Sequence, residues 1–114
     1  METQRLIGKF YAARPLMRDN DYPQRVVELM HGEVDEVGGE LIGDVDPEKL
    51  GLEIADVVIY AMCLAEMFSI DLNHAVLKKI AINEERFPAH LFDYSSGDDF
   101  EGIYMARKRE LGER

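Results

Sequence analysis

Two acidic pairs dominate the chemistry that this chain can support. They are Glu33-Val34-Asp35-Glu36 and Glu53-Ile54-Ala55-Asp56, the second continuing into Val57-Val58-Ile59-Tyr60. Each pair has i, i+3 spacing, so its two acids share one face of a helix. The second pair interrupts an otherwise apolar helix. Burying an uncompensated carboxylate costs on the order of several kcal/mol, so four of them directed toward one core indicate a bound cation.

The expected cation is Mg²⁺, with Mn²⁺ as a substitute. Carboxylate oxygens are the hard ligands that these ions prefer, and the sequence has no cysteine-histidine cluster with zinc spacing. The predicted metal ligands are Glu33, Glu36, Glu53 and Asp56. Two alternatives remain. In the first, Glu33 and Glu36 are only the solvated edge of an amphipathic helix and bind no metal. In the second, the first acidic pair of the metal site is Glu36 and Glu40 instead.

The apolar periodicity predicts an all-α fold. A first helix over 3–18 is expected to end or kink at Pro15, and Gly38-Gly39 predicts a distorted end or close packing in the second. Asp46-Pro47 is a strong helix start, and Asp98 or Asp99 is expected to cap the last helix, after a polar loop at Ser95-Ser96-Gly97. The expected bundle has four to five helices, over 3–18, 23–42, 47–68, 72–87 and 98–111.

Composition narrows the class of protein. The 114 residues predict a single domain over 1–114, and a net charge of -10 argues against a nucleic-acid duplex as partner. The longest apolar run, 57–65, is too short to cross a membrane, which needs roughly 20 residues. Cys63 is alone, which excludes an intrachain disulfide, and Met1–Phe10 lacks the apolar core of a signal peptide, so a cytoplasmic location is expected.

Two further patterns bear on the chemistry. Lys79, Asn83 and Arg86 share one face of the expected helix over 72–87, where the cations could hold phosphate oxygens or simply complement the helix dipole. Glu28-x-x-His31 resembles half of a di-iron carboxylate site, but Asp71-x-x-His74 is a poor second copy because it straddles a helix start.

The order of these motifs resembles the MazG-like all-α NTP pyrophosphohydrolases. The E-x-x-E and E-x-x-D pairs are followed by Lys79, Asn83 and Arg86-Phe87-Pro88, which is similar to the family's K-x-x-x-N-x-x-R-[FY]-P ending. The resemblance covers roughly 26–88. The chain departs from the family in having Gly32 where many members have a second glutamate.

The resemblance implies a fold and an activity. It implies Mg²⁺-dependent hydrolysis of a nucleoside triphosphate to the monophosphate and pyrophosphate, with a role in clearing the nucleotide pool. Glu33, Glu36, Glu53 and Asp56 would be the catalytic and metal-binding residues, and Lys79, Asn83 and Arg86 would bind the substrate. The alternatives are a phosphoribosyl-ATP pyrophosphohydrolase and a non-catalytic acidic oligomer that binds a structural cation or a basic partner.

The helix expected over 47–68 also predicts self-association. Its apolar residues point in nearly every direction around the axis, which is typical of a helix buried on all sides. A chain of this length cannot cover such a helix well, so the bundle is expected to be completed in a homodimer or homotetramer.

Overall fold

Three prolines each open a helix of the chain. The computed structural model describes residues 2–94 and 99–112. Pro15, Pro23 and Pro47 each occupy a first-turn position, where a missing N–H costs nothing. The resulting helices are α1 (Glu2–Ala12), α2 (Pro15–Asn20), α3 (Pro23–Glu40), α4 (Pro47–Met67), α5 (Leu72–Arg86) and α6 (Phe100–Glu110), with a short 3₁₀ turn, η1 (Ala89–Leu91).

The all-α prediction is confirmed for the described ranges, which contain no strand. There is one helix more than expected, because Pro15 does not kink a single helix but starts a new one after Ala13 and Arg14. Asp98 and the Ser95-Ser96-Gly97 loop lie outside the described residues, whereas Asp99 does cap α6 by accepting from the Gly102 N–H at 2.8 Å. No helix of the described part is long and apolar enough to span a membrane.

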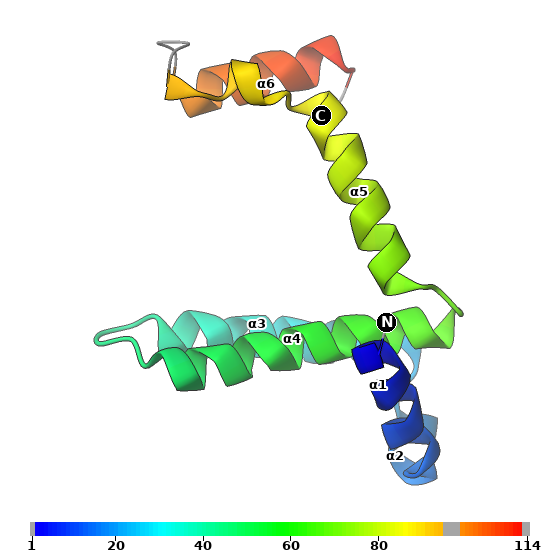
Figure 1. Ribbon diagram of the computed structural model, residues 1–114. Coiled ribbons are helices and arrows are strands. Elements are labelled where there is room, and N and C mark those ends of the chain that lie inside the picture. The colour runs from blue at the N-terminus through cyan, green and yellow to red at the C-terminus, as the bar shows by residue number, and fades with distance from the viewer. Residues whose placement is uncertain (1, 95–98, 113–114) are drawn as a thin grey trace. The chain divides into compact units, whose positions relative to one another are not determined.

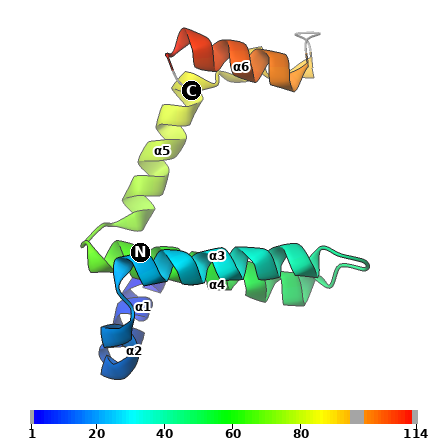
Figure 2. The same cartoon turned by 180° about the vertical axis from the view of Figure 1, so that it is seen from behind.

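Residues 1–72 form one compact unit in which α3 and α4 lie side by side and antiparallel (Figures 1 and 2). The turn between these helices uses Gly43 at a φ of +75°. The side chain of Asp46 caps α4, accepting from the Glu48 N–H at 3.0 Å. The glycines near the end of α3 meet nothing within 4 Å where a Cβ would stand, so a frayed end with i, i+3 bonds, and not close packing, accounts for them.

α1 packs against the C-terminal half of α4. Gly8 lies at this contact, where an added Cβ would stand 3.1 Å from a terminal oxygen of the exposed Glu66 side chain. The most buried residues of this unit are Val26 of α3, Met62, Cys63 and Ala65 of α4, and the polar Gln4 of α1. The Gln4 amide donates to the Ile70 carbonyl at 2.6 Å and accepts from the Leu72 N–H at 3.0 Å, so α1 holds the segment that follows α4.

Residues 73–114 form the second compact unit, which holds most of α5 together with η1 and α6. Its centre is aromatic: Phe87 stacks on Tyr104 with ring centroids 5.1 Å apart, and Phe100 also stacks on Tyr104, at 5.5 Å. The Arg107 guanidinium donates to the Glu85 carbonyl at 2.9 Å and to the Arg86 carbonyl. These bonds satisfy carbonyls that the end of α5 would otherwise leave unpaired.

Candidate metal centre

Three carboxylates meet where α3 and α4 face each other. Glu33 of α3 and Glu53 and Asp56 of α4 each offer an oxygen, and the three oxygens lie within 4.8 Å of one another. The i, i+3 spacing on α4 places its two acids on one face, and the antiparallel packing brings Glu33 opposite them. Among the described residues this is the one group of three acids, cysteines or histidines close enough to share a cation.

Two oxygens of this cluster lack the solvation that a carboxylate requires. The Oε2 atoms of Glu33 and Glu53 are buried, and within the described part of the chain neither has a hydrogen-bond partner. Such an atom costs free energy unless a cation or an ordered water compensates it. The donor set, which is entirely carboxylate oxygen, therefore fits a hard divalent cation such as Mg²⁺.

Glu36 completes the set of four acids, at the exposed edge. Its side chain lies within hydrogen-bonding range of Glu53, and this contact is the largest cause of the raised pKa of the Glu53 carboxyl, followed by burial. Two carboxyl groups can hydrogen-bond only when one carries a proton, which explains the direction. Burial and then the charge of Glu36 raise the pKa of Glu33 as well.

The structure thus brings together Glu33, Glu53 and Asp56, with Glu36 beside them, as the spacing predicts. Glu40, the alternative in a shifted register, is not part of the three-acid cluster. Glu28 and His31 are not in it either, so the described residues give no support to the di-iron alternative. That these acids bind metal remains a prediction.

The predicted substrate-binding residues share one strip of α5. Lys79 and Asn83 are exposed, and the Arg86 guanidinium donates to the Asn83 side-chain oxygen at 3.1 Å. Arg86 also lies over the Phe87 ring, 4.9 Å from its centroid. The three residues belong to the second unit, and their role in binding a substrate remains a prediction.

Tyr60 extends the cluster along α4. Burial raises the pKa of its phenol, and the charges of Glu33, Asp21 and Asp56 raise it further. Beyond it, burial raises the pKa of Tyr11, which also interacts with Cys63. Cys63, Arg18 and Asp21 also lie in this region, and the sequence alone assigns no role to any of them. No spacing signal could have found them, because they come together only when α1 packs against α4 and α2 against α1.

Comparison with known proteins yields related sequences, although no family model matches the chain. It is 34% identical over 108 residues to human dCTP pyrophosphatase 1, an alignment that covers 83% of this chain and 62% of the human protein. The rat and mouse proteins of the same name are each 32% identical over 103 residues, covering 79% of this chain and 59% of theirs. The chain thus spans about three fifths of the length of these curated relatives.

Proposed function

Because the chain is a homologue of the MazG-like all-α NTP pyrophosphatases, we propose that it hydrolyses a nucleoside triphosphate to the monophosphate and pyrophosphate. The observation that carries the proposal is the meeting of Glu33, Glu53 and Asp56 at one point, with buried carboxylate oxygens that no described residue satisfies. From the name of the relatives, dCTP is the first substrate to test. Clearance of unwanted nucleotides is the corresponding role in the cell.

Glu33, Glu36, Glu53 and Asp56 would hold Mg²⁺, with Mn²⁺ as a substitute. Bound there, the ion would offset the repulsion between these acids and the triphosphate and would lower the pKa of a water molecule. The acids supply negative charge at the interface of α3 and α4, so a cation held there would place the triphosphate beside them. Without a cation the same charge would repel the substrate.

In the proposed reaction, a water oxygen attacks the α-phosphorus and the bond from that phosphorus to the bridging oxygen breaks, which releases pyrophosphate. A cluster carboxylate accepts the proton of the water. Lys79 and Arg86 would stabilise charge on the phosphoryl oxygens, and Asn83 would hold the sugar or a phosphate.

The direct test is pyrophosphate release from a panel of NTPs and dNTPs, with and without Mg²⁺, for the wild type and Glu53→Gln. We expect metal-dependent release that falls by at least about a hundredfold in the variant, since a group that positions water and charge is lost. Glu28→Gln is the matched control, because Glu28 is exposed on the same helix as Glu33 and outside the cluster.

The opposite result would redirect the assignment. If the wild type releases no pyrophosphate from any nucleotide, phosphoribosyl-ATP becomes the substrate to test. If Mg²⁺ raises the melting temperature and no nucleotide raises it further, the chain is a cation-binding protein without this activity.

A further inference from the structure

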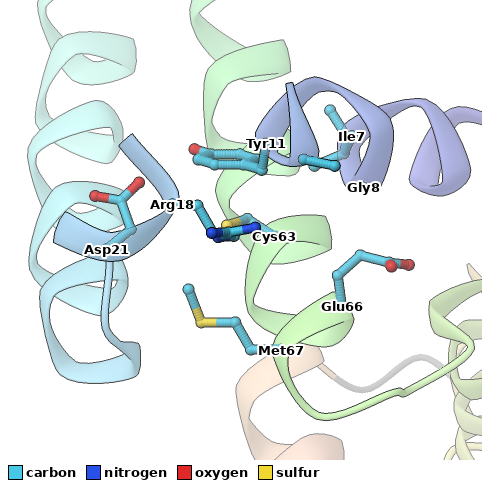
Figure 3. Close-up of a pocket in the computed structure, with 9 residues that line it drawn as sticks. Ile7, Gly8, Tyr11, Arg18, Asp21, Cys63, Glu66 and Met67 are labelled. Carbon is cyan, nitrogen blue, oxygen red and sulfur yellow. The ribbon is translucent and has the colours of Figure 1, made fainter. Parts of the chain in front are cut away.

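A cavity of about 310 Å³ opens beside α4 within the first unit. α1, α2 and α4 form it, and its wall mixes apolar and polar groups: Ile7, Tyr11, Arg18, Asp21, Cys63 and Met67. In Figure 3 the Tyr11 ring lies on one side of this space and Met67 on the other, with the Arg18 guanidinium and the Cys63 thiol between them. Its size lies at the lower end of the range for small-molecule sites, which are mostly apolar with a few polar groups.

The cavity continues the acidic cluster along one face of α4. Asp56, Tyr60, Cys63 and Met67 follow one another at helical spacing, and the rise per residue places Cys63 roughly 10 Å beyond Asp56. Tyr60 connects the two regions, since the charges of Glu33 and Asp56 and that of Asp21 all act on its phenol. If the phosphates of a nucleotide lie at the acidic cluster, its base would thus reach the cavity.

Asp21 is one of two carboxylates in this wall, and the other, Glu66, is exposed. The side chain of Asp21 is 12% exposed, and its ion pair with Arg25 is long, at 3.9 Å. Its backbone N–H donates to the Met17 and Arg18 carbonyls at the end of α2, which fixes the position of the residue. A carboxylate held in a largely apolar wall, with only a long ion pair, is suited to accept a hydrogen bond from a bound molecule.

We propose that this cavity receives the base of the nucleotide and that Asp21 determines specificity by accepting a hydrogen bond from an exocyclic amino group. The inference rests on the proposed function and assigns the substrate class of that site. A base with a carbonyl oxygen in the same place would set lone pairs against the carboxylate, so the site rejects it. The apolar wall and the Tyr11 ring contact the faces of the base.

The test compares dCTP with dUTP, which presents a carbonyl where cytosine has its amino group. We measure kcat/KM for both with Mg²⁺, for the wild type, Asp21→Asn and the control Asp44→Asn, which changes an exposed acid outside the cavity. The wild type is expected to prefer dCTP. Asp21→Asn is expected to lower the dCTP/dUTP ratio about tenfold or more, because its amide can donate to the uracil carbonyl that the carboxylate rejects, while Asp44→Asn leaves the ratio unchanged.

A substrate lacking the amino group gives the same test without a substitution, should Asp21→Asn fold poorly. The 2-pyrimidinone deoxynucleoside triphosphate is expected to react with the wild type about tenfold or more slowly than dCTP. Hydrolysis of both dCTP and dUTP with an unchanged ratio in Asp21→Asn, or equal rates for dCTP and the 2-pyrimidinone analogue, would overturn this inference alone. No hydrolysis of any nucleotide by the wild type would overturn the proposed function as well.

Discussion

The carboxyl groups of Glu33 and Glu53 destabilise the metal-free chain at neutral pH. Burial and neighbouring acids raise their folded-state pKa values above the ordinary value of 4.5. The folded state therefore binds more protons than the unfolded state just above that value, and stability is lost as the pH rises through the folded-state pKa values. The same charges provide the attraction for a divalent cation.

Glu53→Gln should reveal this destabilisation when EDTA removes bound metal. As the pH rises above about 4.5, the melting temperature of the metal-free wild type should fall, and the variant should lose less over the same range. At neutral pH the variant should melt above the wild type. With Mg²⁺ the order reverses, because the wild type gains stability from binding. Parallel pH profiles for the two proteins, recorded by differential scanning fluorimetry, would contradict the prediction.

The residues of the acidic cluster were predictable because helical spacing alone fixes which side chains share a face. For Glu53 and Asp56, the i, i+3 separation and the apolar run after them were enough to predict that both acids share one helix face. Asp21 was different: in the sequence it reads as part of a turn before Pro23, and its place in a cavity depends on how α2 packs. Local rules carry no information about that packing.

At the scale of the elements, α1 secures the end of α4. Gln4 has both ends of its amide engaged, with the Ile70 carbonyl at 2.6 Å and the Leu72 N–H at 3.0 Å, although only 5% of the residue is exposed. A glutamine on an amphipathic helix looks like a surface residue in sequence. The starts at Pro23 and Pro47 and the Asp46 cap were predictable, since they act within one turn, whereas Pro15 was expected to end or kink a helix and starts one instead. The role of Gln4 was not predictable, because its partners are more than 60 positions away.

Gln4→Ala is therefore expected to cost about 1–3 kcal/mol, since it leaves backbone groups of Ile70 and Leu72 without these partners. Gln4→Glu keeps an acceptor for the Leu72 N–H but loses the donor to Ile70, so it should also destabilise the chain. Urea unfolding followed by circular dichroism measures both. Gln24→Ala is the control, because Gln24 is exposed on α3. If Gln4→Ala lowers the free energy of unfolding no more than the control does, the hydrogen bonds of Gln4 do not stabilise the chain.

At the scale of the whole molecule, the first unit leaves part of its central helix open. On α4, Leu52 is 65% exposed, Ile54 46% and Val58 41%, whereas burial is confined to Met62, Cys63 and Ala65. Within the first unit, α4 is thus not buried on all sides, as its sequence had led us to expect. Apolar side chains grouped on one helix are typical of a surface that associates.

We accordingly predict a homodimer or homotetramer built from chains of 13.0 kDa. Multi-angle light scattering behind size exclusion should give two or four times the chain mass at micromolar concentration. Leu52→Gln should shift the equilibrium toward smaller species, because it removes apolar area that association would bury. Glu48→Gln, an exposed change one turn earlier on α4, should not. A wild type that is monomeric and still hydrolyses nucleotides would contradict this prediction. In that case α4 would be covered from within the chain, and each site would be complete in one copy.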